Sequence, residues 1–271
     1  MESTVALFAG EGKLPLEIAR RLTDRGFPPV VYTLGEADSG LSRYALDRVS
    51  LPRLELGQAL ADLKKRGLTK VMLAGVVPKT VMYKPALMDE GLKRLIQHVP
   101  LRDDHSLLGA VVAAIESFGL SVLSYRDLII DLMAPSGFIA GREPNREEAA
   151  DVDYGREVAS SILPLSFGQT VVVSGRAIVA VEAMEGTDAT LLRAGGLIRQ
   201  GVVVKMMRAD QDERFDLPTV GLGTLRNMAR AGLRCLAVEA HRTILLDGDA
   251  FRDFAQKEGI AVTGVHHCLF S

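Results

Sequence analysis

Apolar runs alternate with amphipathic segments along most of this 271-residue sequence. In the first half, the runs have the length and β-branched content of buried strands and span residues 5–9, 30–33, 70–74 and 120–124. The segments between them repeat apolar residues at helical spacing and span residues 16–25, 57–66, 87–97 and 106–118. This alternation predicts a mostly parallel sheet with helices on both faces.

The pattern breaks between residues 131 and 153, where turn residues such as Pro135 and Pro144 replace it. We therefore expect an N-terminal domain at 1–130, a linker at 131–150 and a distinct C-terminal α/β domain at 151–271. In the last, the expected helices span 152–161, 189–200, 222–231 and 249–257, and the expected strands 170–173, 177–181, 202–204, 235–239, 243–246 and 260–265. The short turn at Gly175 favours an antiparallel hairpin for the first two of these strands.

Composition limits the class of protein. With 48% hydrophobic residues the chain can bury a core in each domain, and a net charge of −2 argues against a nucleic-acid binder that works by bulk electrostatics. Cys235 and Cys268 lie far apart without a CxxC motif, which suits a reducing cytoplasm. There is no signal-peptide pattern, and no apolar run reaches the roughly 18 residues of a spanning helix. We expect a soluble or peripheral protein.

A glycine turn follows the first apolar run, with the sequence Gly10-Glu11-Gly12-Lys13-Leu14-Pro15. Strand, glycine turn and helix open a nucleotide-binding βα unit, in which backbone N–H groups and the helix N-terminus receive an anion. Pro15 stands where a further glycine is usual, and it also suits a plain helix start. The turn can therefore bind a phosphate or sugar, or be structural only. The carboxyl end of strand 70–74, at Gly75 and Val76, should lie beside it.

Two acidic clusters follow predicted strands in the second half. The first reads Glu182-Ala183-Met184-Glu185-Gly186-Thr187-Asp188, and the second extends over residues 205–218. Ligands of open α/β sheets bind beyond the carboxyl ends of the strands. Carboxylates interleaved with Lys205, Arg208 and Arg214 can hold a divalent cation beside a phosphate. The alternative is a solvated loop, with Thr187 or Asp188 as the N-cap of helix 189–200.

Other polar residues have simpler interpretations. His266 and His267 are adjacent, so on a strand they face opposite ways and do not easily share one metal ion. His241, at a turn between two strands, can contact a ligand or be structural. Asp103 or Asp104 is a natural N-cap for helix 106–118, with ligand contact as the alternative.

Several motifs resemble one known family. They are residues 9–15, Asp103-Asp104, Gly168-Gln169, residues 182–188 and residues 211–218, which read Gln-Asp-Glu-Arg-Phe-Asp-Leu-Pro. In these, the chain is similar to the UDP-2,3-diacylglucosamine pyrophosphatases of lipid A and lipopolysaccharide biosynthesis, in the LpxI form. The family tends to have Lys-Pro-Gly before the Gln-Asp pair, whereas this chain has Arg208-Ala209-Asp210. Charge is retained there but a rigid turn is lost.

The resemblance implies a hydrolase that splits UDP-2,3-diacylglucosamine into UMP and 2,3-diacylglucosamine 1-phosphate (lipid X), with a divalent cation, usually Mg²⁺. It also implies a Rossmann-like N-terminal domain, a linker and a distinct α/β C-terminal domain. A substrate with two acyl chains implies a peripheral protein at the cytoplasmic side of the inner membrane. A homo-oligomer is possible, and no nucleic-acid partner is expected.

Site residues are assigned with this chemistry in mind. The catalytic candidates are Asp212, Asp188, Asp216 and Glu185, and the metal candidates are Asp212, Asp188 and Glu182. Those for substrate binding are Gly10, Gly12, Lys13, Leu14, Gly75, Val76, Asp104, Gln169, Thr187, Lys205, Gln211 and Arg214. Apolar residues such as Met82, Leu87, Met88, Leu92, Leu95 and Ile96 either line an acyl groove or belong to the core.

Two other classes of function stay open from the residues alone. The strand-glycine-helix opening suits a nicotinamide-dependent oxidoreductase, for which Glu36 or Asp38 would have to contact the ribose. A non-catalytic lipid or sugar-nucleotide binding protein could use the same cleft. The acidic clusters disfavour the second alternative, because a pure anion binder has little use for so many carboxylates.

Overall fold

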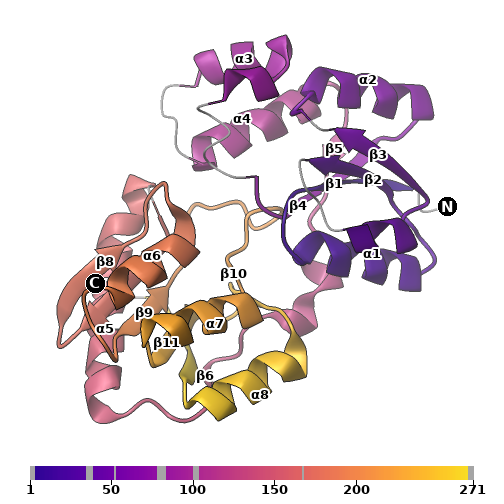
Figure 1. Ribbon diagram of the computed structural model, residues 1–271. Coiled ribbons are helices and arrows are strands. Elements are labelled where there is room, and N and C mark those ends of the chain that lie inside the picture. The colour runs from indigo at the N-terminus through magenta and orange to yellow at the C-terminus, as the bar shows by residue number, and fades with distance from the viewer. Residues whose placement is uncertain are drawn as a thin grey trace. The chain divides into compact units, whose positions relative to one another are not determined.

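The computed structural model describes residues 4–34, 39–51, 53–77, 84–99, 104–166 and 168–267. The chain forms two compact units (Figure 1). The N-terminal unit comprises Met1–Ile130 together with Asp212–Asp216, and the C-terminal unit comprises Asp131–Gln211 and Leu217–Ser271. A short segment from the second half of the sequence is therefore part of the N-terminal unit. None of the described helices is long and apolar enough to cross a membrane.

The N-terminal unit contains one parallel sheet, with strand order β3-β2-β1-β4-β5. Its strands are β1 (Val5–Ala9), β2 (Val30–Leu34), β3 (Asp47–Leu51), β4 (Lys70–Ala74) and β5 (Ser121–Val122). Its helices are α1 (Leu14–Asp24), α2 (Leu56–Arg66), α3 (Glu90–Gln97) and α4 (Asp104–Ser117). The predicted Rossmann-like parallel sheet is confirmed.

Side chains of β1 alternate between the two faces of this sheet. Ala6 and Phe8 belong to a core that includes residues of α2 and α4, whereas Leu7, between them, is buried on the other face. Phe8 stacks on Tyr32 of β2, with ring centroids 5.1 Å apart. Phe215, from the segment Asp212–Asp216, packs against this same core.

The C-terminal unit contains a six-stranded mixed sheet of order β6-β13-β11-β9-β7-β8. Its strands are β6 (Gly137–Gly141), β7 (Thr170–Ser174), β8 (Ala177–Val181), β9 (Val202–Lys205), β11 (Cys235–Glu239) and β13 (Ala261–Val265). Strands β9, β11 and β13 are parallel, and β7 and β8 form the predicted antiparallel hairpin. A small parallel pair, β10 (Thr219–Val220) and β12 (Ile244–Leu245), lies outside this sheet.

Successive residues of each central strand serve two separate cores. Leu236 and Val238 of β11 join one core, and Cys235 and Ala237 join the other. Helix α5 (Arg146–Ile162) contributes to the second core, and α6 (Gly186–Gly195), α7 (Leu222–Ala231) and α8 (Gly248–Glu258) to the first. Burial raises the pKa of the Cys235 thiol to about 12, so it is a core residue, as expected.

The expected linker at 131–150 is not a linker in the structure. It contains β6, which pairs antiparallel with β13, and the first turn of α5. The sequence of β6, Gly-Phe-Ile-Ala-Gly, is too short and too rich in glycine to stand out as a strand. Strand β3 was not predicted either. It is a short edge strand, and its charged residues Asp47 and Arg48 hide the apolar pattern.

Helix α5 begins at Arg146 and not at 152, because Asn145 and Glu148 form a capping box. The side chain of Asn145 accepts from the N–H of Glu148, and Glu148 accepts from the N–H of Asn145, both at 2.9 Å. Arg142 donates two further hydrogen bonds of 2.6 Å to Glu148, which is only 7% exposed. Burial alone would raise the pKa of Glu148, but these donors lower it below its usual range.

Glu148→Gln should therefore lower the free energy of unfolding by about 2 kcal/mol at neutral pH. A carboxyl with a lowered pKa stabilises the fold above its unfolded pKa, and this contribution is lost as the pH falls through the folded pKa. The difference between wild type and variant should thus close below about pH 4. Urea unfolding at several pH values checks this, and a difference that does not change with pH would contradict it.

Candidate functional site

The glycine turn after β1 lies against the end of β4, as predicted. Gly10 donates to the carbonyl of Ala74 at 2.9 Å, and the backbones of Glu11 and Val76 exchange hydrogen bonds of 2.8 and 2.9 Å. A Cβ on Gly10 would lie 2.6 Å from the Val76 oxygen, and one on Gly75 would lie 2.7 Å from Pro15 Cγ. Close packing between the two loops therefore requires both glycines, whether or not a ligand binds there.

The remaining residues of this turn start the first helix. Gly12 has a φ of 95°, Lys13 is the N-cap of α1, and Leu14 is buried as its first residue. The helix N-terminus is thus formed as a candidate anion site would require. Asp104 begins α4, but its side chain lies outside the described part of the structure, as do Asp103, Met82, Glu36 and Asp38.

The first acidic cluster contains a partly buried chain of polar contacts. Lys205 Nζ donates to Thr187 Oγ1 at 3.0 Å, and Thr187 donates to Glu182 Oε2 at 3.1 Å. Lys205 and Glu182 are 8% and 7% exposed. A Cβ on Gly168 would lie 2.1 Å from the Glu182 carbonyl oxygen, so this glycine lets the preceding loop approach the cluster. The structure thus brings together Glu182, a metal candidate, with Thr187 and Lys205, two of the substrate-binding candidates.

Glu185 and Asp188, the other two carboxylates of this cluster, are more exposed than Glu182. Glu185 forms a 2.6 Å ion pair with Arg193, and its pKa is lowered by a backbone N–H bond and by this arginine. Asp188 is exposed on α6. The helix expected at 189–200 spans Gly186–Gly195 with Glu185 as N-cap, so Thr187 and Asp188 lie inside its first turn and the alternative that either caps it does not hold. The buried pair with Lys205 holds Thr187 in place of a capping bond.

Two glutamines are brought together after β9. Gln169 Nε2 donates to Gln211 Oε1 at 2.9 Å, and the N–H of Arg208 donates to the same oxygen at 3.3 Å. Gln211 is 5% exposed. Both glutamines were assigned to substrate binding, and in the structure their side chains hold the loop 206–211 in shape.

Asp212 and Arg214 belong to the N-terminal unit and bind each other. Arg214 donates to Asp212 through Nε at 3.0 Å and Nη2 at 2.8 Å, and through Nη1 to Glu116 at 2.8 Å. These carboxylates raise the pKa of Arg214. The guanidinium also lies over the Phe215 ring, 5.5 Å from its centroid. Arg214, assigned to phosphate from the sequence, anchors Asp212 to the N-terminal unit.

The same segment has two further attachments. Glu213 pairs with Arg126 of the N-terminal unit, and the N–H of Asp216 donates to the Asp212 carbonyl at 3.1 Å. Asp212 and Asp216, two of the catalytic candidates, thus share one short turn. The candidate residues therefore fall into two sets, one in each unit.

Carboxylates that could hold a metal ion occur in both acidic clusters. Among the residues that the structure describes, no three His, Cys, Asp or Glu side chains form a metal-binding group. Mg²⁺ is usually held by one or two carboxylates together with phosphate oxygens and water. Glu182, Asp188 and Asp212 fit that mode, since each offers carboxylate oxygens without a closed protein cage.

Comparison with known proteins identifies the family. Residues 4–132 match the model of the LpxI N-terminal domain, and residues 135–263 match that of the LpxI C-terminal domain. A protein of Caulobacter vibrioides, named UDP-2,3-diacylglucosamine pyrophosphatase LpxI, is 34% identical over 96% of this chain and 97% of its own. The chain belongs to the LpxI family.

Similarity to a solved structure adds nothing to the LpxI assignment. An L-threonine dehydrogenase from Phytophthora infestans has 12% identity and a TM-score of 0.28. The alignment covers 53% of this chain and only 41% of the dehydrogenase. These values are too low to carry an argument about function.

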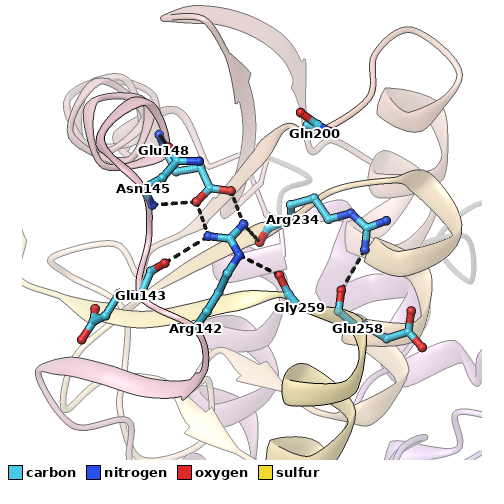
Figure 2. Close-up of a pocket in the computed structure, with 8 residues that line it drawn as sticks. All are labelled: Arg142, Glu143, Asn145, Glu148, Gln200, Arg234, Glu258 and Gly259. Atoms are coloured by element: carbon cyan, nitrogen blue, oxygen red, sulfur yellow. Dashed lines mark hydrogen bonds and ion pairs between the residues drawn. The ribbon is translucent and has the colours of Figure 1, made fainter.

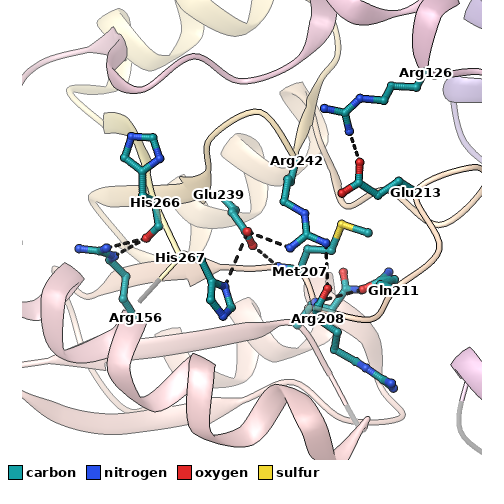
Figure 3. A network of polar contacts seen from close by, with 11 residues as sticks. Arg126, Arg156, Met207, Arg208, Gln211, Glu213, Glu239, Arg242, His266 and His267 are labelled. Atoms are coloured by element: carbon teal, nitrogen blue, oxygen red, sulfur yellow. Dashed lines mark hydrogen bonds and ion pairs between the residues drawn. The ribbon is translucent and has the colours of Figure 1, made fainter. Parts of the chain in front are cut away.

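Sequence reasoning missed a buried carboxylate at the end of β11 in this LpxI chain. Glu239, 2% exposed, accepts from the N–H of Met207 at 2.7 Å and from Arg242 Nη1 at 3.1 Å (Figure 3). Arg242 in turn donates to the carbonyl of Arg208 at 3.0 Å. Since β9 and β11 are parallel neighbours, Glu239 lies at the edge where the loop 206–211 begins. Its position at a strand end was the only sequence signal.

A second region, a polar cavity of about 640 Å³, lies at the opposite edge of this sheet (Figure 2). Gln200, Arg234 and Gly259, which line it, precede β9, β11 and β13. It is thus separate from the loops at the carboxyl ends. Its wall includes the Arg142–Glu148 ion pair, which explains its polar character without a ligand.

Replacing Glu239 tests its role in the loop 206–211. Glu239→Gln removes one charged acceptor and should lower the free energy of unfolding by about 2 kcal/mol. Backbone amides of this loop should exchange with deuterium faster, because glutamine has one uncharged acceptor oxygen for the Met207 N–H and Arg242 where glutamate has two charged ones. Glu157→Gln, exposed on α5, is the matched control. Unchanged exchange at 206–211 in a folded Glu239→Gln protein would contradict this role.

Proposed function

We propose that the chain hydrolyses the diphosphate of UDP-2,3-diacylglucosamine to UMP and 2,3-diacylglucosamine 1-phosphate. The observation that carries the proposal is the relative named for this substrate, aligned along nearly the whole of both chains. The two sets of polar residues support it, because diphosphate hydrolysis requires charge neutralisation and an oriented water molecule.

Lys205 is the proposed contact for phosphate charge. Its ammonium has three donors, one of which goes to Thr187 at 3.0 Å. Burial strengthens its interaction with an anion, since little water screens it. Thr187 stands in the first turn of α6, where backbone N–H groups and the helix dipole also favour a phosphate.

Asp212 is the proposed catalytic carboxylate, with Asp216 in the same turn as support. Arg214 fixes the Asp212 side chain through two of its nitrogens. A carboxylate held in this way is suited to orient a water molecule and accept its proton. Glu185, paired with Arg193 in the C-terminal unit, is a supporting candidate for the general base.

A divalent cation, Mg²⁺ in the first instance, is the proposed cofactor. When bound, it would withdraw charge from the phosphate oxygens. Its candidate ligands, assigned from the sequence, are Asp212, Asp188 and Glu182.

The remaining assignments concern the rest of the substrate. Gly10, Gly12, Lys13, Leu14, Gly75 and Val76 are proposed as a wall for the substrate beside the N-terminus of α1. Val76 is 64% exposed and Val77 41%, so the loop after β4 offers apolar surface. The substrate has two acyl chains. We therefore also propose that the protein binds peripherally at the cytoplasmic face of the inner membrane.

Release of UMP from UDP-2,3-diacylglucosamine by the purified protein tests the proposal. We expect release with Mg²⁺ and none with a chelator. Asp212→Asn should lose at least about 100-fold in kcat while remaining folded. Asp249→Asn, whose side chain is 94% exposed on α8, is the matched control and should keep full activity.

Two results would contradict the proposal in different ways. A wild type that binds the lipid without releasing UMP would favour a binding protein. UMP release that Asp212→Asn retains would support the reaction but remove Asp212 from it.

Lys205→Met tests the phosphate contact separately. The apolar side chain has similar length, so packing is retained while the charge is lost. We expect kcat/KM to fall by about 10- to 100-fold, equivalent to one hydrogen bond to a charged group. Lys257→Met, on an exposed position of α8, serves as control, and equal kcat/KM in both variants would refute the assignment.

A further inference from the structure

Two histidine rings converge on one serine hydroxyl in the C-terminal unit. Ser136 Oγ lies 3.3 Å from His241 Nε2 and 3.1 Å from His266 Nε2. The ring centroids are 6.3 Å apart. His241 follows β11 and His266 follows β13, and because these strands are parallel neighbours, both rings lie at the carboxyl edge of the sheet. The topology thus brings together residues more than one hundred positions apart.

His267, the residue after His266, does not approach the Ser136 hydroxyl. Figure 3 shows the rings of His266 and His267 on opposite sides of the chain, and His267 Nδ1 lies 3.7 Å from the buried Glu239. This agrees with the expectation that adjacent histidines on an extended chain diverge. The second ring comes instead from the neighbouring strand, which spacing along the sequence could not indicate.

Backbone contacts hold all three segments in place. His241 donates its N–H to the carbonyl of Ala134 at 2.8 Å, and Ala134 donates to the carbonyl of Thr243 at 2.8 Å. Arg156 donates to the carbonyl of His266 through two nitrogens (Figure 3). A Cβ on Gly264 would lie 1.8 Å from the Pro135 oxygen, so only glycine permits this approach of the Ser136 segment to β13.

His241 also adopts an uncommon backbone conformation. Its φ is 62°, in the left-handed region that costs a non-glycine residue free energy. Glycine or asparagine would suit that turn better. The fold nevertheless keeps an imidazole there, directed at the same hydroxyl as His266.

We propose that His241 and His266 bind a transition-metal ion of the zinc class through their Nε2 atoms. Neutral imidazole nitrogen is a preferred ligand for Zn²⁺, Cu²⁺ and Ni²⁺, at about 2.1 Å, whereas Mg²⁺ prefers oxygen. Both Nε2 atoms lie within 3.3 Å of Ser136 Oγ, so a metal ion beside that hydroxyl can reach both once the imidazole rings turn toward it. Ser136 Oγ and water would fill the remaining positions of a tetrahedral site.

This site is independent of the proposed hydrolase activity. It uses nitrogen ligands and none of the carboxylates assigned to catalysis. Millimolar Mg²⁺ should therefore not displace Zn²⁺ from it.

Titration of the metal-free full chain with Zn²⁺ against a chromophoric chelator tests the proposal. We expect one Zn²⁺ per chain in the presence of Mg²⁺. His266→Ala and His241→Gly should each weaken binding by more than the roughly 10- to 100-fold typical of residues around a metal site. Glycine relieves the positive φ at 241, so this variant is expected to fold at least as well as wild type.

Controls separate the pair from other zinc ligands. His98→Ala removes an exposed histidine of the N-terminal unit and should leave the affinity unchanged. Ser136→Ala should change it only a few-fold, since both imidazoles remain. Cu²⁺ bound to the wild type should show electron-paramagnetic-resonance couplings to two imidazole nitrogens. Equal Zn²⁺ affinity in folded His241→Gly, His266→Ala and wild type would overturn the proposal.

Discussion

The attachment of one five-residue segment to the N-terminal unit constrains the rest of the molecule. Asp212–Asp216 comes from the second half of the sequence, yet Phe215 packs into the N-terminal core and Arg214 binds Glu116 at 2.8 Å. The same arginine holds Asp212. These contacts of the Asp212 carboxylate are therefore made within the N-terminal unit, although the residues before and after this segment belong to the C-terminal unit.

At the carboxyl edge of the C-terminal sheet, two buried charged side chains are held by specific polar partners. Lys205 and Glu239 end neighbouring parallel strands, and both are more than nine-tenths buried. Each has specific partners, Thr187 for the lysine and the Met207 N–H with Arg242 for the glutamate. Buried charges without such partners would be strongly unfavourable. The same edge of the sheet therefore positions both the buried charged side chains and the loop 206–211.

Much of this fold followed from hydrophobic periodicity. Strand β1, the glycine turn beside β4 and the β7–β8 hairpin were all predicted, because each has a strong local signal in apolar runs and turn residues. Strand β6 was missed, since pairing with β13 and not its own sequence makes it a strand. The start of α5 depended on a capping box that lay inside an expected linker.

The sequence indicated which types of residue form the candidate site, but not which of them contact each other. The clusters around Glu182 and Asp212 were recognised, but spacing could not reveal that they belong to different units. Nor could it show that Arg214 binds Asp212, or that His241 and His266 meet at Ser136. The first pairing depends on the local turn of the segment, and the second on the order of β11 and β13 in the sheet, neither of which a single sequence displays.

The kcat of Phe215→Ala tests most directly whether the attachment of Asp212–Asp216 controls the chemistry. This substitution changes none of the proposed catalytic residues and removes the ring that packs against the N-terminal core and lies under the Arg214 guanidinium. The account predicts a folded protein with UMP release slowed by about 100-fold, as expected for a misplaced catalytic carboxylate. Phe118→Ala, at a 65% exposed position, should be unaffected. A folded Phe215→Ala protein with wild-type kcat would contradict the account.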